Sequence, residues 1–521
     1  MGHLFVTRGD ITKLACDAWL LPGDAAGYVN RAWHGGEDIV GLLENGRLPA
    51  SLRARLRERR VLRLRAAEAG RPAVWFADTG GTEAHALGWY VEAIDQFVRE
   101  EHPHTALRRR PLLAIPFIGS GAGGQDHARG GLLEELLPEA DKLAGRVEKD
   151  VVFAAFDDPS FTAAQAVRRR NPALYWSELG EPLLGRAREL ADWAATGKLV
   201  VFFGAGVSTA AGLPDWPGLI NQLASRVGLE EEFGQATDRL LDWAAVIEAR
   251  FAARAATPAE GERQLRATIA DIFRPASRST LTHTLLASLP VREFVTMNYD
   301  QLFEQAAEAA RSPVAVLPWQ TTKGRERWLL KMHGSIDHHE EIVLTRADYL
   351  RYTSTRGALR GLVQALLITR HMLFVGFSLT DDNFYRIADD VRRAVRRDSA
   401  NQEPFGTALA LAPEPLTSAL WANDLDIVAL AGADDRDRTE AAWLLDVFLD
   451  YMLAQATTVS RHLLDPRFTQ ILTAQEKDLR DAVQALVQRL QEAGIDPAGW
   501  PPIEAMLENL GRPHPSQSST R

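Results

Sequence analysis

The segment 200–216 constrains the fold most, because an apolar run passes directly into closely spaced glycines. It reads Val-Val-Phe-Phe-Gly204-Ala-Gly206-Val-Ser208 and continues with small residues. Glycines at the end of a buried strand allow a tight turn, and free amides at the start of the following helix can bind a pyrophosphate. The segment therefore predicts a nucleotide-binding turn, with a tight turn lacking a ligand as the alternative. No acidic residue stands at a strand end about 20 positions further on, which argues against an ordinary dehydrogenase site.

Three further polar motifs follow apolar runs later in the chain. Each stands at the end of a predicted strand. Asn298 and Asp300 follow 293–296, His333 and Gly334 follow 329–332, and the strand 372–377 ends in a turn with Gly376, Ser378 and Asn383. The carboxyl ends of strands are where open α/β sheets bind ligands, and histidine suits proton transfer near neutral pH. Taken singly, Asn298 and Asp300 are as typical of helix caps, and His333 of a hydrogen-bonded structural histidine.

Apolar runs alternate with amphipathic helical patterns in both halves of the chain, which is typical of layered α/β domains. The predicted strands are 4–7, 18–21, 61–64, 74–77, 112–118 and 151–156, then 199–203, 293–296, 329–332, 342–344, 372–377, 407–411 and 427–430. The predicted organisation is an α/β domain at 1–165, a linker and helix at 166–196, a second α/β domain at 197–438, a helical segment at 439–510 and a disordered tail at 511–521. Because the stretch 168–182 is rich in proline, glycine and charge, fragments 1–170 and 183–521 are each expected to hold a core.

Composition narrows the classes of partner. The formal net charge of -10 provides no basic field for nucleic acid. The single cysteine, Cys16, cannot form an intrachain disulfide or a cysteine-based zinc site, so no metal is expected. The first residues lack a signal-peptide pattern, and no run of 18 apolar residues could span a membrane. We therefore expect a cytoplasmic protein without membrane or nucleic-acid partners.

The four motifs GAGVSTAAGLPDW, TMNYD, KMHGS and FVGFSLTDDN resemble, in this order, those of the sirtuin (SIR2) family. The resemblance implies a doubly wound, parallel-sheet NAD-binding domain. It also implies contacts to NAD from Gly204, Ala205, Gly206, Ser208, Asp215, Gly376, Ser378 and Asn383. Asn298 and Asp300 would flank the nicotinamide pocket, and His333 would be the catalytic base above the ribose hydroxyls.

Two departures from the family's deacylases bear on the activity. The segment 337–369 contains none of the four zinc-binding cysteines, and the family's Asn-Ile-Asp is here Asn-Tyr-Asp. GLPDW, NYD, HGS, VLTRADY and GFSLTDDNF resemble instead the bacterial SIR2-like domains of anti-phage defence, which deplete NAD. The resemblance implies an NAD glycohydrolase, with a homo-oligomer and a partner defence protein such as an ATPase as expected assemblies. The alternatives are a non-enzymatic NAD or ADP-ribose sensor, which would need neither Asn298 nor His333, and a zinc-free ADP-ribosyltransferase or deacylase.

The N-terminal domain carries a second resemblance. Arg8-Gly-Asp10-Ile11-Thr-Lys-Leu14 and the glycine-rich stretch 114–124 resemble the opening and the phosphate loop of macro domains. This implies an ADP-ribose site formed by Asp10, Ile11, Gly119, Ser120, Gly121 and Gly123. Leu21-Pro-Gly-Asp24 replaces the family's Asn-Ala-Ala-Asn, so a macro-like scaffold used for protein contacts is the alternative.

Overall fold

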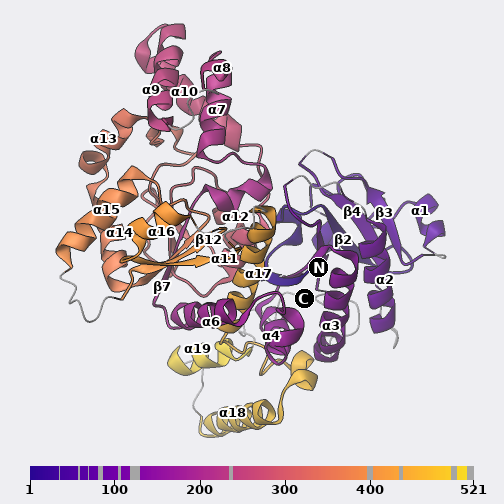
Figure 1. The fold of residues 1–521 in the computed structure, drawn as a ribbon. Coiled ribbons are helices and arrows are strands. Elements are labelled where there is room, and N and C mark those ends of the chain that lie inside the picture. The colour runs from indigo at the N-terminus through magenta and orange to yellow at the C-terminus, as the bar shows by residue number, and fades with distance from the viewer. Residues whose placement is uncertain are drawn as a thin grey trace.

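Two helix-covered sheets make up most of the molecule (Figure 1). The computed structural model describes residues 1–34, 36–56, 59–68, 70–79, 86–101, 103, 107–117, 129–233, 239–395, 403–412, 414–432, 438–494 and 501–512. Within these ranges the predicted α/β class is confirmed, since both sheets are built mainly of parallel strands joined by helices. None of the described helices is both long enough and apolar enough to cross a bilayer.

The first sheet has the strand order β1-β6-β5-β2-β4-β3. Its strands are β1 (Leu4–Arg8), β2 (Ala18–Gly23), β3 (Val61–Arg65), β4 (Ala73–Asp78), β5 (Leu112–Pro116) and β6 (Asp150–Ala155). Only β3 pairs antiparallel in this sheet, and β4, β5 and β6 are buried along their whole length. The accompanying helical elements are η1 (Ile11–Lys13), η2 (Arg31–Trp33), α1 (Ala50–Arg55), α2 (Ala86–Glu100), α3 (Arg129–Val147) and α4 (Asp158–Arg169). Continuous apolar strands such as Leu-Leu-Ala-Ile-Pro suit a sheet that is covered on both faces.

The second sheet is entirely parallel, with the order β13-β12-β11-β7-β8-β10-β9. Its strands are β7 (Leu199–Phe203), β8 (Glu293–Thr296), β9 (Ala315–Leu317), β10 (Trp328–Lys331), β11 (His371–Val375), β12 (Gly406–Ala410) and β13 (Leu425–Ala429). The predicted strand at 342–344 is wrong: these residues form an irregular segment between η4 (His339–Glu341) and α13 (Arg346–Thr355). The physical reason is that the amide of Val343 donates to the carbonyl oxygen of His333, in a loop, and Thr345 then caps α13.

Helices cover the second sheet and build a separate lobe beyond its edge. The covering elements are η3 (Ala205–Ala211), α11 (Leu281–Ser288), α12 (Leu302–Ala309), α13, α14 (Gly357–Thr369), α15 (Asp382–Ala394) and α16 (Pro415–Trp421). The lobe consists of α7 (Trp216–Arg226), α8 (Glu230–Phe233), α9 (Leu240–Arg254) and α10 (Pro258–Phe273), which are grouped at the top of Figure 1. Its apolar core also includes Tyr299 and Leu302, so the lobe packs directly on the segment that follows β8.

The two sheets share one apolar core rather than being joined by an exposed linker. Residues 166–169 continue α4, α5 (Pro172–Tyr175) follows, and α6 (Glu181–Ala195) packs on α17 (Arg438–Ala456). Arg168 is fully buried, and its Nη1 donates to Oδ1 of Asp450 on α17 at 3.0 Å. Trp176 Nε1 donates to Oδ2 of the same carboxylate at 2.7 Å. Arg168, which resembled linker charge, thus has a buried partner in the C-terminal segment. This packing does not favour the prediction that fragments 1–170 and 183–521 each hold an independent core.

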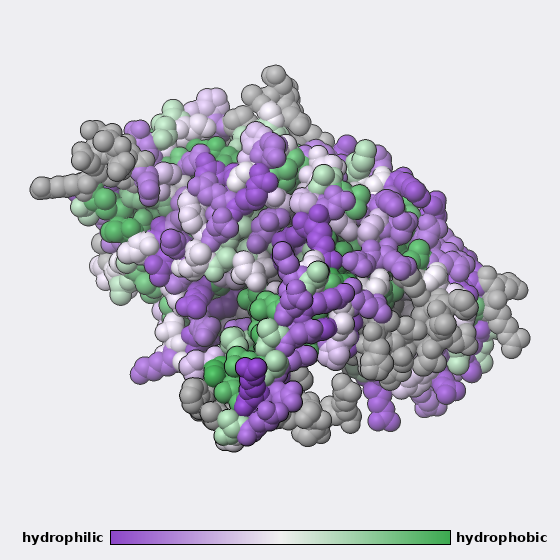
Figure 2. All heavy atoms as spheres, turned by 90° about the horizontal axis from the view of Figure 1, so that it is seen from below, coloured by the Kyte–Doolittle hydropathy of each residue, from purple (hydrophilic) through white to green (hydrophobic). Residues whose placement is uncertain are grey.

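The C-terminal segment continues beyond α17 with η5 (Pro466–Ile471), α18 (Ala474–Glu492) and α19 (Pro501–Asn509). α18 has no buried residue, and its Leu479 and Leu486 side chains are about half exposed. It lies at the bottom of Figure 1, and the molecule seen from that side mixes hydrophilic atoms with scattered hydrophobic patches (Figure 2). α18 therefore contributes no buried side chain to the shared core.

Candidate active site

The four predicted motifs meet at one edge of the second sheet. Gly204 follows β7, Asn298 follows β8, His333 follows β10 and Gly376 follows β11. All four strands are parallel, so their carboxyl ends share one edge. β7 lies between β11 and β8, and the chain builds the sheet outward from it on both sides. Such a switch in strand order is where open α/β sheets bind their ligands.

Three glycines hold the loops after β7 and β11 in contact. Gly206 N donates to the carbonyl oxygen of Gly376 at 2.9 Å. A Cβ added to Gly206 would lie 2.9 Å from Cα of Gly376, and one added to Gly204 would lie 2.7 Å from its carbonyl oxygen. Gly376 has φ 59°, and a Cβ there would lie 2.7 Å from the amide nitrogen of Val207. Glycine is therefore needed here for backbone packing, whether or not a ligand binds.

We expect Gly376→Ala to lower the free energy of unfolding by about 1–3 kcal/mol, because left-handed backbone strain and the clash with Val207 act together. Gly361 is the matched control, since it lies exposed inside α14 and a Cβ there meets nothing within 4 Å. Gly361→Ala should be neutral or stabilise by about 0.5–1 kcal/mol. Urea unfolding of both variants measures the difference. Equal unfolding midpoints would contradict the close contact between the loops after β7 and β11.

A buried polar cluster contacts the loop that follows β7. Ser208 Oγ donates to Asp300 Oδ2 at 2.9 Å, and Asn298 Nδ2 donates to Ser208 Oγ and to the carbonyl oxygen of Gly204, both at 3.2 Å. The three side chains are buried, although they come from two strand ends far apart in sequence. Thr296 contributes by accepting from the amide of Asn298 at 3.0 Å, which fixes the turn after β8. The amide, hydroxyl and carboxylate are thus held in one defined arrangement.

His283 is a member of this cluster that the sequence did not indicate. It lies on α11 with Nε2 3.5 Å from Ser208 Oγ and Nδ1 2.8 Å from Thr280 Oγ1. Burial lowers the pKa of His283 to about 4, although the charge of Asp300 raises it. The imidazole is therefore neutral near pH 7. The only signal in the sequence is a Thr-Leu-Thr-His run at a helix start, which equally indicates a capping box, and that box is present.

His333 lies buried on the other side of the same edge. Its Nε2 is 3.3 Å from Asn383 Nδ2 and 3.8 Å from Asp381 Oδ2. The rings of Tyr349 and Tyr352 stand edge-on to the imidazole, with centroids 5.4 and 5.9 Å away. Burial lowers the pKa of His333, and the Asp381 carboxylate opposes that shift. His333 is therefore a largely uncharged base beside a carboxylate that can stabilise its protonated form.

Comparison with known proteins supports the resemblance. A family model described as a SIR2-like domain matches residues 292–430, from the start of β8 to the end of β13. Residues 292–430 of this chain are therefore similar to a SIR2-like domain. The chain is 33% identical over 214 residues to the NAD(+) hydrolase ThsA of Enterococcus faecium, which covers 40% of this chain and 42% of that protein. It is 32% identical over 204 residues to the NAD(+) hydrolase ThsA of Bacillus cereus (strain MSX-D12), covering 38% and 40%.

A third relative is the Defense-associated sirtuin 2 of Bacillus subtilis, 25% identical over 225 residues, which is 42% of this chain and 21% of that protein. The alignments thus span less than half the length of each of these three relatives. The predicted resemblance to SIR2-like defence proteins is confirmed for this part of the chain. The macro-like character of residues 1–165 stays a prediction.

The other residues predicted to bind nucleotide have varied surroundings. Ser378 is exposed, and its hydroxyl lies 2.7 Å from the hydroxyl of Thr380. Asp215 caps α7 by accepting from Gly218 N at 2.9 Å. In the N-terminal unit, Asp10 caps η1, accepting from Thr12 N at 2.9 Å, and Ile11 is buried. The remaining members of that predicted site, Gly119, Ser120, Gly121 and Gly123, lie outside the described residues.

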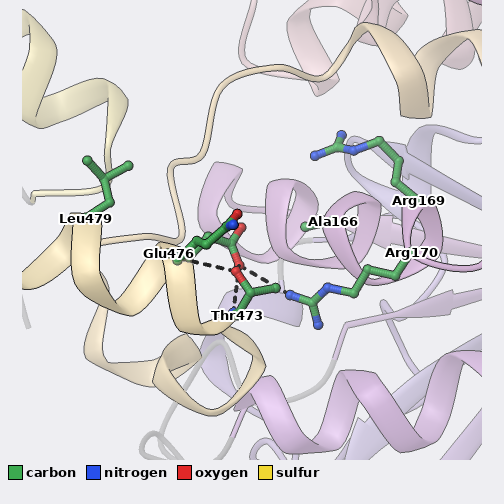
Figure 3. Close-up of a pocket in the computed structure, with 7 residues that line it drawn as sticks. Ala166, Arg169, Arg170, Thr473, Glu476 and Leu479 are labelled. Atoms are coloured by element: carbon green, nitrogen blue, oxygen red, sulfur yellow. Dashed lines mark hydrogen bonds and ion pairs between the residues drawn. The ribbon is translucent and has the colours of Figure 1, made fainter.

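Two hollows lie away from the strand-end cluster. One of about 460 Å³ lies between α4 and α18, where Arg170 reaches Glu476 (Figure 3). Arg169, which also lines this hollow, donates to the carbonyl oxygens of Ala454 and Thr457. The other, of about 280 Å³, lies beside α12 and β9 and is lined by Glu304, Trp319 and Asp337 among others. Neither lining includes a predicted residue of the SIR2-like site. The Ser208, Asn298 and Asp300 side chains are buried, and Ser208 Oγ is hydrogen-bonded to both of the others.

Proposed function

We propose that this protein is an NAD(+) hydrolase that cleaves the nicotinamide–ribose bond and acts as an NAD-depleting effector in anti-phage defence. The observation that supports the proposal is that Asn298, Asp300 and His333 follow the adjacent parallel strands β8 and β10, at the switch point of a sheet that matches a SIR2-like domain over residues 292–430. The domain's relatives include proteins named NAD(+) hydrolase. Glycine-bordered loops at a switch point suit the pyrophosphate of a dinucleotide.

Each polar group has a role in bond cleavage. Loss of nicotinamide leaves positive charge on the ribose, as in glycoside cleavage generally. The Asp300 carboxylate, held by Ser208, provides negative charge close to that cation. Asn298 presents amide donors that can orient the carboxamide or the attacking water once the substrate replaces its contact to Ser208. His333 accepts the proton that water releases on bonding to the ribose carbon.

The experiment is product analysis after incubating the full-length protein with NAD in isotopically labelled water. Hydrolysis predicts equimolar nicotinamide and ADP-ribose, with the label in the ADP-ribose. An unlabelled cyclic isomer would mean that the ribose hydroxyl replaces water, and the hydrolase assignment would be wrong. Nicotinamide formed only with an added acyl-lysine peptide would favour the deacylase or transferase alternative. Bound but intact NAD would favour the sensor.

We also propose that the N-terminal unit controls this activity. The segment 11–15 pairs with Ser279, whose amide donates to Lys13 O at 3.0 Å and whose carbonyl accepts from Ala15 N at 2.8 Å. The next residue, Thr280, donates to the carbonyl oxygen of Val207 and contacts His283 in the polar cluster. The predicted ADP-ribose-binding segment thus adjoins the cluster, and ADP-ribose or a related nucleotide is the ligand we propose. Homo-oligomer formation and a partner defence protein belong to the same proposal.

Control of this kind requires different ligand affinities in the active and idle states. Calorimetry of the full-length His333→Ala variant with ADP-ribose, compared with the same protein carrying Asp10→Ala, tests the proposed site. We expect the second substitution to remove one binding event. An unchanged isotherm would reduce the N-terminal unit to a scaffold.

A further inference from the structure

Asp381 stands between His333 and Tyr349 and is held by hydrogen bonds to both of its oxygens. Oδ1 accepts from the amide of Phe384 at 3.0 Å, which caps α15. Oδ2 accepts from the hydroxyl of Tyr349 at 2.7 Å and lies 3.8 Å from His333 Nε2. Both the carboxylate and the imidazole are largely shielded from solvent, with 12% and 6% of their side-chain surface exposed. The carboxylate is therefore fixed in direction as well as in position.

Tyr349 reaches this carboxylate from a different part of the chain. It lies on α13, within the cysteine-free segment 337–369 that follows His333. A capping box between Thr345 and Asp348 fixes the start of α13, and Val343 N donates to His333 O at 2.9 Å. The segment that replaces the zinc-binding stretch of the family's deacylases thus contributes a hydroxyl to the surroundings of His333.

The charged groups near His333 come from three places. Asp381 precedes α15, Asp348 lies on α13, and Arg356 lies between α13 and α14. The Arg356 guanidinium donates from Nη1 and Nη2 to the carbonyl oxygens of Met332 and Glu341. Burial lowers the pKa of His333, and the Asp381 carboxylate raises it. Arg356 lowers this pKa further, whereas Asp348 raises it. Among these groups, Asp381 is the anion whose oxygen directly faces the imidazole.

We propose that Asp381 is a positioning residue that stabilises protonated His333 during NAD cleavage, and that Tyr349 holds the Asp381 carboxylate in place. The inference rests on the function proposed above. In the step concerned, the carbon–nitrogen bond breaks and nicotinamide leaves with its electron pair. A water oxygen bonds to the ribose carbon, and one water proton passes to the imidazole. The resulting positive charge faces the Asp381 carboxylate until the proton returns to solvent.

The test compares Asp381→Asn with Asp382→Asn in the full-length protein. Asparagine caps helices as well as aspartate does, so Asp381→Asn should fold, and only the charge is lost. We expect kcat for nicotinamide release to fall by about tenfold to a thousandfold, with KM for NAD changed by less than about threefold. The acid limb of the kcat–pH profile should move to lower pH, because the pKa of His333 falls. Asp382 is exposed one position away, and Asp382→Asn should behave as wild type.

Tyr349→Phe is expected to shift the acid limb of the kcat–pH profile in the opposite direction to Asp381→Asn. Without the hydroxyl, the Asp381 charge is less dispersed, so the acid limb should move to higher pH while kcat falls less than in Asp381→Asn. A folded Asp381→Asn variant with wild-type kcat and an unmoved acid limb would overturn the inference. Histidine NMR titration of the ligand-free protein reports the His333 pKa independently of activity. If the wild type releases no nicotinamide, the proposed function fails, whereas the NMR shift still tests the Asp381–His333 pair.

Discussion

Asn298→Ala and His333→Ala are each expected to slow nicotinamide release by about 10²–10⁴-fold, the usual cost of removing a positioned acid, base or polar group. Asn298→Ala removes the donors to Ser208 and Gly204. His333→Ala removes the histidine at the carboxyl end of β10, whose Nε2 lies 3.8 Å from Asp381 Oδ2. Because both groups are proposed to act on the reacting bond, kcat should fall more than the affinity for NAD.

The measurement is steady-state nicotinamide release, with thermal unfolding of each variant to establish that it is folded. His339→Ala is the matched control, because His339 lies on η4 with part of its side chain in solvent. We expect wild-type turnover from that variant. Wild-type turnover from folded Asn298→Ala or His333→Ala would mean that the chemistry lies elsewhere.

Arg168→Ala is expected to lower the free energy of unfolding by about 3–5 kcal/mol, because it leaves the buried Asp450 carboxylate without its guanidinium partner. That is a large share of the roughly 5–15 kcal/mol that stabilises a typical domain. Arg99→Ala is the control, since Arg99 forms an exposed pair with Asp95 along α2, and such pairs contribute about 0.3–0.5 kcal/mol. Urea unfolding of both variants measures the contrast, and equal losses would contradict the shared-core description.

The same pair predicts an acid dependence of stability. Burial raises the pKa of Asp450, but the Arg168 guanidinium and His3 outweigh it and lower the pKa to about 2. A carboxylate whose pKa is lower in the folded than in the unfolded state stabilises the fold above its unfolded pKa of about 3.9. That contribution is lost as the pH falls from about 4 towards 2. The loss should be smaller in Arg168→Ala, where the folded-state pKa is no longer depressed.

The sequence predicted both the fold and the candidate site where an apolar strand is followed directly by glycine or polar residues. Val-Val-Phe-Phe-Gly204-Ala-Gly206 predicts a buried strand and a tight turn without help from the rest of the chain. Parallel strands then place Asn298 and His333 at the same edge for a geometric reason. The predicted strand at 342–344 failed because a short apolar run does not reveal whether its hydrogen bonds go to a sheet or to a loop.

Residues that depend on distant partners could not be predicted. Arg168 resembled linker charge until Asp450, 282 positions away, was seen beside it. Asp381 resembled an ordinary turn residue, because its relation to His333 depends on the loop after β11 and on Tyr349 from α13. The sequence around His283 indicated only a helix cap, not its place in the polar cluster. In each case the meaning of the residue comes from tertiary packing.

We propose that this protein cleaves NAD without a cysteine zinc site. Cys16 is the single cysteine, and burial raises the pKa of its thiol, which disfavours the thiolate that binds metal. Among the described residues, no group of three or more His, Cys, Asp or Glu side chains could hold a metal ion. The most direct measurement is nicotinamide release from NAD by the full-length protein in excess chelator, with the zinc content of the same sample determined. We predict undiminished release and substoichiometric zinc. Stoichiometric zinc together with loss of nicotinamide release on chelation would contradict it.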